Sequence, residues 1–387
     1  MVYPIPRLPV LDWTTFSGTK LSATPCLLTH PNNQFTHSGR ASILLALEML
    51  GIGRGDKVLV PTYHCPTMIA PIVAVRAIPI FYPLDGNGAP RLDWIKRENT
   101  SDVRALLVAH FFGLPQPLAE VREWCNQNGV RLIEDCAHAL FGSSDNRAIG
   151  SWGDLSIASL TKFLPVPEGG CLVTNMTLAP IPSLHQQSAI GQIKAGFDIV
   201  HIGANYGRLK GLGIVISGLY KFLGKFKRKN QAKFQEMRSE LAVSEGFTID
   251  TVQSHRTLTH ASRWIACHAP RERIVSGRRE KYIFFTHAFS GLSGMRPLLL
   301  DLPTDCAPYV FPLWVDHPDP GYSELRRLKF PVSRWDRLWP NVAVIEGDCG
   351  INWSSHVLQL ACHQDLTSGE LQRMVDTVKQ VYGEANR

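Results

Sequence analysis

A lysine in an apolar, proline-stiffened loop is the residue of this sequence with the clearest chemical potential. Lys162 lies in residues 159–170, SLTKFLPVPEGG, just before a predicted strand at 171–174. Apolar surroundings lower the pKa of a lysine and make its neutral amine available for imine formation with a carbonyl compound. A lone lysine is more often a surface residue whose stem covers apolar neighbours, so this interpretation needs support from other segments.

A carboxylate at the end of a strand is the second candidate. Asp135 lies in residues 133–138, IEDCAH, where a buried strand is predicted to end. An unpaired carboxylate is costly there. It is useful if it faces a protonated pyridine nitrogen, because holding that proton makes the ring a better electron sink. A helix-capping role for Asp135 is the alternative and is about as common at such positions.

A predicted helix start at residues 37–42, HSGRAS, is the third candidate. Free backbone N–H groups and the positive end of the helix dipole suit a phosphate, and Gly39 permits its close approach. An ordinary capped helix is the more common explanation for such a segment taken alone. The chain order of anion cradle, strand-end carboxylate and loop lysine favours one shared site.

These segments belong to a region of alternating helical and strand patterns. The predicted helices are 38–49, 68–76 and 118–127, and the predicted strands are 57–60, 78–82, 105–109 and 130–133. Such alternation predicts a mostly parallel sheet covered on both faces, with ligands at the carboxyl ends of its strands. Later elements end in a helix at 368–382. We therefore expect a large domain of residues 1–275 and a small C-terminal domain of residues 276–387.

Composition indicates a globular cytoplasmic protein. The 387 residues are 44% hydrophobic and 19% charged, which is enough for a sizeable core. Nine scattered cysteines without a CxxC pair are typical of reduced thiols. Apolar stretches are too short to cross a bilayer, and prolines and Arg7 interrupt the N-terminus where a signal peptide would be apolar. No paired ligand spacing accompanies His64 and Cys65, so no metal site is expected.

A basic amphipathic run at residues 210–233, within the basic segment 205–235, allows three interpretations. We favour a solvated helix in a dimer arm. Contact with an anionic membrane surface and reception of an anionic substrate or carrier protein are the alternatives. The net charge of +7 modestly favours anionic ligands and is also common for a solvated surface, and no nucleic-acid partner is expected.

Taken together, these motifs resemble the DegT/DnrJ/StrS family of pyridoxal-phosphate enzymes. The matching segments are SGRASI from Ser38, GDKVLVP from Gly55, HFFG from His110, EDCAH from Glu134 and IGSWGD from Ile149. In the family, the imine lysine lies six residues before the Glu of Glu-Gly-Gly, and Lys162 precedes Glu168 by this spacing. The resemblance covers residues 36–175 and resumes more loosely at 360–366, LACHQDL.

The resemblance implies the α/β fold of aspartate aminotransferase (fold type I), with a mostly parallel sheet in the large domain and a small C-terminal α/β domain. It implies that Lys162 forms the imine with pyridoxal phosphate and later shuttles the proton. Asp135 would hold the pyridine nitrogen, and His138 would lie near the ring hydroxyl. The implied phosphate contacts are Gly39, Arg40 and Ser159.

The sequence departs from the family pattern at four places. Arg40 replaces the usual Thr, and the Asn-Tyr-Arg segment used around the dimer interface has only a poor match at residues 201–206. The stretch between Asp154 and Lys162 is about two residues short of the usual pattern. Where an aromatic residue usually covers the cofactor ring, the loop 61–66 reads PTYHCP and aligns Cys65. Tyr63 or His64 is the candidate to replace it, and the alignment does not choose between them.

The expected function is an aminotransferase that moves an amino group from an amino acid such as glutamate to a keto-sugar, expected to be nucleotide-linked, in polysaccharide or natural-product biosynthesis. The sugar and the expected homodimer follow from the resemblance alone. The alternatives are a pyridoxal-phosphate enzyme acting on a non-sugar amine or carbonyl substrate, and a non-catalytic member with a binding or regulatory role. Retention of Lys162 argues against the dehydratase branch, which loses this lysine.

Overall fold

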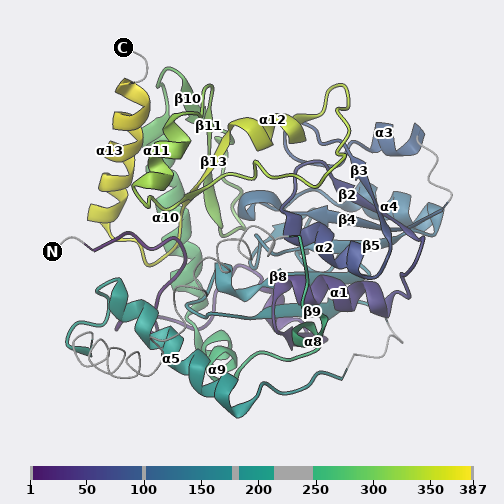
Figure 1. The fold of residues 1–387 in the computed structure, drawn as a ribbon, viewed down its shortest axis with the longest axis horizontal. Helices are drawn as coiled ribbons and strands as arrows, with labels where there is room; N and C mark the ends of the chain where they lie inside the picture. Colours follow the sequence, from purple (N-terminus) through teal and green to yellow (C-terminus); the bar gives the residue numbers. More distant parts are fainter. Residues whose placement is uncertain (1–2, 98–101, 177–182, 213–246, 385–387) are drawn as a thin grey trace, which may run out of the picture.

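The computed structural model describes residues 3–97, 102–176, 183–212 and 247–384, which form two main sheets surrounded by helices and a two-stranded sheet of β6 and β7 (Figure 1). Most of the basic run 210–233 lies outside the described residues, so its interpretation stays a prediction. Within these ranges, no helix is both long and apolar enough to cross a membrane.

The larger sheet has seven strands in the order β1-β9-β8-β5-β4-β2-β3. Neighbouring strands from β8 to β3 are parallel, whereas β9 is antiparallel to both β8 and β1. The mostly parallel sheet predicted from the alternating pattern is therefore confirmed. Its strands are β1 (Asn33–Thr36), β2 (Lys57–Pro61), β3 (Ile78–Tyr82), β4 (Val103–Ala109), β5 (Arg131–Asp135), β8 (Leu155–Ser159) and β9 (Gly170–Thr174).

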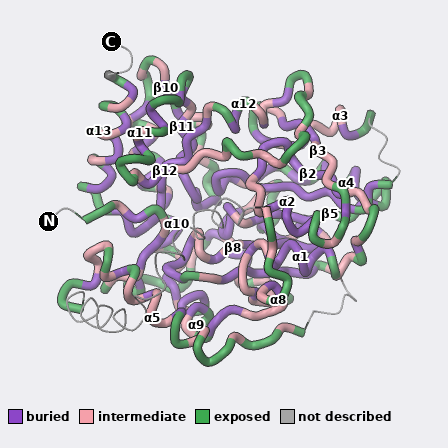
Figure 2. The backbone as a smooth tube through the Cα atoms, viewed as in Figure 1, coloured by how far each residue is buried: buried purple, intermediate pink, exposed green. Residues whose placement is uncertain are grey.

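Helices link the parallel strands and cover the sheet. They are α1 (Gly39–Met49), α2 (Pro66–Ala74), α3 (Leu92–Arg97) and α4 (Ala119–Asn128). The predicted cap of α1 is present, because Ser38 Oγ accepts a hydrogen bond from the Ala41 backbone N–H at 3.1 Å. The strands β4 and β5 are buried along nearly their whole length, as strands covered on both faces must be (Figure 2).

The second main sheet is smaller and antiparallel, with its strands in the order β10-β11-β13-β12. Its hydrophobic core is separate from that of the large sheet and includes Phe285, Phe311 and Met374. Its strands are β10 (Met295–Pro297), β11 (Val310–Val315), β12 (Val332–Ser333) and β13 (Val357–Ala361), with α11 (Gly321–Arg327), α12 (Cys349–His356) and α13 (Ser368–Glu384) beside them.

Between the two sheets, the described part of the chain has the helices α5 (Ala189–Asn205), α8 (Thr251–Ser254), α9 (His260–His268) and α10 (Arg271–Phe289). The proposed domain boundary near residue 275 falls inside α10. This helix contributes Ile274 and Val275 to the core of the large sheet and Phe285 to that of the small sheet. The short elements are η1 (Leu27–Thr29), η2 (Phe111–Gly113), η3 (Leu160–Lys162), β6 (Ser143–Ser144) and β7 (Arg147–Ala148).

Candidate active site

A cavity of about 690 Å³ opens at the carboxyl ends of the parallel strands. Its walls come from the start of α1, the loops after β2, β4 and β5, the turn η3, and the segment around α8. Six of the predicted site residues line it together: Gly39, Arg40, Asp135, His138, Ser159 and Lys162. The structure thus brings together segments that are more than 120 residues apart in the sequence.

Lys162 enters the cavity from η3, directly after β8. Its carbonyl oxygen accepts a hydrogen bond from Arg278 at 2.7 Å, which holds the turn in place. Its Nζ lies 5.2 Å from the centre of the Tyr309 ring. Burial lowers the pKa of the Lys162 amine to about 8, against the opposing effect of Asp135, so a nucleophilic neutral amine is accessible near neutral pH.

Asp135 ends β5 and is only 5% exposed. The backbone N–H of Ala137 donates to its Oδ1 at 2.8 Å, and Asp135 lines the cavity. Burial raises the pKa of the Asp135 carboxyl, and Lys162 partly offsets this effect. A cationic group in the cavity would favour the carboxylate form, which is the arrangement that a protonated pyridine nitrogen needs.

His138 lies against two aromatic rings from the segments next to the strands β11 and β12 of the small sheet. Its ring centre is 4.5 Å from that of Tyr309 and 5.0 Å from that of Trp335. Burial lowers the pKa of His138 well below its usual value, so the imidazole is neutral. Its Nδ1 accepts a hydrogen bond from the Phe112 backbone N–H at 3.4 Å, which places the hydrogen on Nε2 as a donor.

The start of α1, which was predicted to bind an anion, lines one part of the cavity. The first N–H groups of a helix have no partner within the helix. A Cβ atom at Gly39 would lie 3.1 Å from the Cβ of Ser159, so glycine permits the close approach of these two segments. Arg40 donates to the carbonyl oxygen of Thr248 at 2.6 Å, so its charge is held at the cavity edge.

Tyr63 and His64, the two candidates to cover the cofactor ring, do not line the cavity. Tyr63 is fully buried beside Trp335, with ring centres 4.9 Å apart, and its hydroxyl accepts a hydrogen bond from Gln359 at 2.9 Å. His64 accepts from the Trp339 backbone N–H at 2.8 Å. Neither residue lines the cavity, whereas Cys65, Thr67 and Met68 from the same loop do. Cofactor contact by Tyr63 or His64 therefore gains no support from this geometry.

The segment around α8 is a cavity wall that the sequence patterns did not reveal. Ile249, Asp250, Gln253 and Ser254 line the cavity, although they lie outside every matched motif. The available local signal is the cap of α8, in which Asp250 Oδ1 accepts from the Gln253 backbone N–H at 3.0 Å. Trp335 is a further wall residue without a sequence signal.

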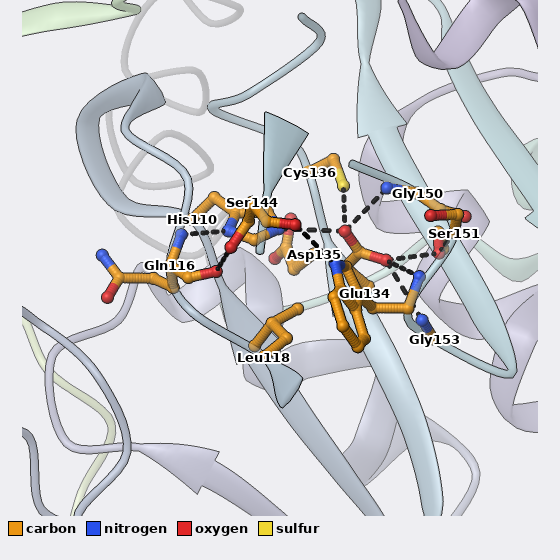
Figure 3. A network of polar contacts seen from close by, with 12 residues as sticks. His110, Gln116, Leu118, Glu134, Asp135, Cys136, Ser144, Gly150, Ser151 and Gly153 are labelled. Carbon is orange, nitrogen blue, oxygen red and sulfur yellow. Dashed lines mark hydrogen bonds and ion pairs between the residues drawn. The ribbon is translucent and has the colours of Figure 1, made fainter. Parts of the chain in front are cut away.

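A buried network beneath the cavity fixes the loops that carry its residues (Figure 3). Glu134 has no exposed surface, and its two carboxylate oxygens accept hydrogen bonds from His110 Nε2 at 3.0 Å, Gly150 N at 2.6 Å, Trp152 N at 3.0 Å, Gly153 N at 3.1 Å and Ser156 Oγ at 3.2 Å. Burial is the largest single influence and raises the pKa of Glu134. His110 and the backbone N–H groups together outweigh it and hold this pKa below its usual value.

This network also contains the one group of possible metal ligands found in the described ranges, namely His110, Glu134 and Cys136. The oxygens of Glu134 are already occupied by hydrogen-bond donors. His110 Nδ1 accepts from the Gln116 backbone N–H at 2.8 Å, so its hydrogen lies on Nε2, towards Glu134. The geometry therefore favours a structural network over a metal site.

Residues 30–290 match the sequence model of the DegT/DnrJ/EryC1/StrS aminotransferase family. The chain belongs to this family. Among its relatives, GDP-perosamine synthase of Vibrio cholerae is 31% identical over 141 residues, which are 36% of this chain and 38% of the relative. L-glutamine:2-deoxy-scyllo-inosose aminotransferase of Streptoalloteichus tenebrarius is 35% identical over 145 residues, 36% and 33% of the two chains. The match thus spans about a third of the length of each of these relatives.

Solved structures of aminotransferases share the fold over most of the chain. The aminotransferase TlmJ from Streptoalloteichus hindustanus has a TM-score of 0.61 at 17% identity and covers 92% of this chain and 87% of its own. PseC from Helicobacter pylori, an aminotransferase involved in pseudoaminic acid biosynthesis, has a TM-score of 0.62 at 13% identity, with coverage of 92% and 88%. The predicted fold class is confirmed.

The residues present fit pyridoxal phosphate, the cofactor of this aminotransferase family. The start of α1 offers N–H groups and a glycine where a phosphate would bind. Asp135 brings a buried carboxyl group to the cavity wall, and the amine of Lys162 has a lowered pKa. The neutral His138 offers an N–H donor at the same cavity.

Proposed function

We propose that this protein is a pyridoxal-phosphate-dependent aminotransferase that moves an amino group from an amino acid to a keto-sugar. The observation that carries the proposal is the gathering of Lys162, Asp135, His138 and the α1 start around one cavity. A transamination needs a neutral amine, a carboxylate that keeps a ring nitrogen protonated, and an anchored phosphate. The residues that would supply all three line this cavity.

When bound, pyridoxal phosphate supplies the electron sink that stabilises negative charge on the substrate carbon. Lys162 would attach the cofactor through its amine and then move a proton between substrate atoms. Asp135 would hold the proton on the pyridine nitrogen, and His138 would donate its Nε2 hydrogen to the ring hydroxyl. Gly39, Arg40 and Ser159 would bind the phosphate, together with the first N–H groups of α1.

The acceptor and the amino donor are proposed from the relatives. Their names specify GDP-perosamine synthesis, a dTDP-linked dehydro-sugar 4-aminotransferase and L-glutamine:2-deoxy-scyllo-inosose transamination. These names support a keto-sugar acceptor, expected to be nucleotide-linked, and glutamate or glutamine as the amino donor. Polysaccharide or natural-product biosynthesis in the cytoplasm is the proposed setting.

A homodimer is the proposed assembly. The apolar side chains of Ile190 and Ile193 on α5 are 80% and 75% exposed, and exposed apolar surface of this kind favours association. We therefore expect the protein to sediment as a dimer. A monomeric mass from equilibrium sedimentation would contradict this assembly.

The absorbance of the purified protein tests the proposed function. We expect added pyridoxal phosphate to give a stable visible band, which L-glutamate or L-glutamine bleaches and an accepting keto-sugar nucleotide restores. Absence of a band in the presence of excess cofactor would rule out the proposed enzyme. A stable band that no amino acid bleaches would retain the cofactor and reject the aminotransferase.

The pH dependence of cofactor attachment should reflect the lowered pKa of Lys162. The neutral amine is the nucleophile, so the attachment rate to cofactor-free protein should rise about tenfold per pH unit below the pKa and level off above about pH 8. Stopped-flow absorbance between pH 6 and 10 measures this profile. A rate that keeps rising towards the usual lysine pKa of about 10.4 would contradict the buried, perturbed amine.

A further inference from the structure

A histidine lies on the cavity wall directly before the capped start of α1. His37 follows Thr36, the last residue of β1, and precedes Ser38, whose side chain caps α1. Its side chain is 30% exposed, and the residue lines the cavity next to Ser38 and Gly39. The proposed phosphate contacts begin at Gly39, so the side chain of His37 comes from the same segment as these contacts.

The contacts of His37 turn one edge of its ring away from the cavity. Its Nδ1 accepts a hydrogen bond from Gln187 Nε2 at 3.3 Å, and the same amide donates to the carbonyl oxygen of Thr257 at 2.8 Å. Nδ1 also lies 3.9 Å from Glu168 Oε2. Neither Gln187 nor Glu168 lines the cavity, so the opposite ring edge, which carries Nε2, is the edge that faces it. Within the described part of the chain, this Nε2 has no hydrogen-bond partner.

Glu168 holds an unpaired carboxylate oxygen beside the other edge of the His37 ring. Its Oε1 accepts hydrogen bonds from the backbone N–H and the hydroxyl group of Thr259, at 3.1 and 2.7 Å. Its Oε2 is buried and has no hydrogen-bond donor among the described residues. A buried carboxylate oxygen without a donor is costly. A proton on Nδ1 of His37 would supply this donor, because Nδ1 lies 3.9 Å away.

The surroundings of His37 determine its charge. Burial is the largest influence and lowers the pKa of His37, and Arg256 acts in the same direction, whereas Glu168 and Asp250 raise it. The pKa stays below its ordinary value, so the imidazole is neutral at neutral pH and its hydrogen lies on Nε2, opposite the contact with Gln187. A phosphate dianion at the start of α1 would favour the imidazolium form, because opposite charges stabilise each other.

We propose that His37 is a further ligand of the cofactor phosphate, and that Glu168 positions it and stabilises its charged form. Nε2 would donate to a phosphate oxygen, and Nδ1, once protonated, would donate to Glu168 Oε2 in place of its contact with Gln187. The inference rests on the cofactor site of the proposed function. The diphosphate of a nucleotide-linked acceptor is another source of phosphate oxygens. Since His37 belongs to the same segment as the α1 start, the cofactor phosphate fits better.

The test compares pyridoxal phosphate with pyridoxal, which carries the same aldehyde without the phosphate. Absorbance titrations of the cofactor-free protein give both apparent dissociation constants, and their ratio is the phosphate preference. We expect H37A to reduce this preference about 10- to 100-fold at about pH 7.5, as the loss of a charge-assisted hydrogen bond predicts. The affinity for pyridoxal should stay within about twofold of the wild type.

H260A is the matched control for H37A. His260 is an exposed residue at the start of α9 and does not line the cavity. The phosphate preference of H260A should equal that of the wild type. H37Q should recover part of the preference that H37A loses, because its amide N–H can replace the Nε2 donor without supplying a charge.

A pH series tests the charge of His37. Phosphate binding raises the pKa of His37, so the bound form holds one proton more than the free form. The phosphate preference of the wild type should therefore fall by at least about threefold as the pH rises from 7 to 9. The phosphate, carboxylates and guanidinium groups keep their charge in this range, and the titration of Lys162 affects both compounds alike. H37Q should show no such fall.

E168Q tests the positioning role of Glu168. The glutamine keeps an acceptor oxygen for Thr259 but removes the charge that stabilises the imidazolium form. We expect it to lower the phosphate preference about tenfold at about pH 7.5, which corresponds to a shift of about one unit in the pKa of His37 in the bound form. It should also flatten the pH dependence, which a purely structural role would leave unchanged. An E168Q variant with the wild-type pH profile would overturn the role of Glu168.

Four outcomes decide the remainder of the inference. An unchanged phosphate preference in H37A would reject His37 as a ligand and retain the proposed function. Equal losses for pyridoxal phosphate and pyridoxal would also overturn the inference, because they would indicate a damaged cavity. Weaker binding of uridine diphosphate by H37A, without a change in phosphate preference, would assign His37 to the acceptor. A wild type that does not bind pyridoxal phosphate would reject the proposed function itself.

Discussion

Replacing Lys162 with alanine is expected to abolish the bleaching half-reaction, with a loss of at least about 10³-fold in its rate. In the proposed mechanism Lys162 provides the nucleophilic amine and the movable base, and a pKa lowered to about 8 suits both roles. Asp135 and His138 remain in place in the variant, so the cofactor should still bind but with a changed spectrum. Stopped-flow absorbance with L-glutamate measures the rate.

The matched control for this variant is K194A. Lys194 is an exposed residue of α5 that pairs with Asp198 at 3.8 Å and does not line the cavity. It should leave the half-reaction unchanged. If K162A retained more than about a tenth of the wild-type rate, Lys162 would not be the proton-moving base, since such a base contributes at least about 10²-fold.

Replacing Glu134 with glutamine should cost about 3–5 kcal/mol of unfolding free energy, because it breaks a buried, fully paired carboxylate. Both oxygens of Glu134 act as acceptors. The groups that donate to them include His110, Gly150 and Gly153. A glutamine must point its NH₂ group at some of them, which leaves donors facing donors. Urea titration of the cofactor-free protein, followed by far-ultraviolet circular dichroism, measures the loss.

S156A is the control for the Glu134 network. It removes one donor, at 3.2 Å from Glu134, without introducing a repulsive group, so its cost should be about 1 kcal/mol. An E134Q variant as stable as the wild type would show that Glu134 is protonated in the folded protein. The network described above would then be incorrect.

The site features predicted from local sequence are those that depend on local backbone chemistry. Ser38 caps α1 as expected, because capping requires only a side-chain oxygen three residues before a backbone N–H group. Asp135 lies at a strand end because the apolar run before it specifies a buried strand. The apolar, proline-containing segment 159–170 predicted that Lys162 lies in a loop before a strand, and the structure has η3 at this place, followed by β9.

The loop after β2 shows where local reasoning fails. Tyr63, His64 and Cys65 are consecutive, and a small rotation of the chain decides which of them faces the cavity. That rotation is set by distant partners, namely Trp335 and Gln359 for Tyr63 and the backbone of Trp339 for His64. No pattern within the loop encodes contacts with residues about 275 positions away.

The same limit applies to the wall around α8. This helix has four residues, too few for a hydrophobic period to be visible, and it reaches the cavity because it packs against α1. Its contribution to the cavity is a property of tertiary packing, so it becomes apparent in the three-dimensional structure alone.

Borohydride reduction of the cofactor-loaded protein, followed by peptide mass mapping, tests the central claim most directly. Reduction makes the bond between cofactor and amine permanent. The account predicts one modified peptide, with the pyridoxyl phosphate mass on Lys162 in the wild type and no such modification at this site in K162A. A label on another lysine, or an unmodified Lys162 in protein that retains the visible band, would contradict it.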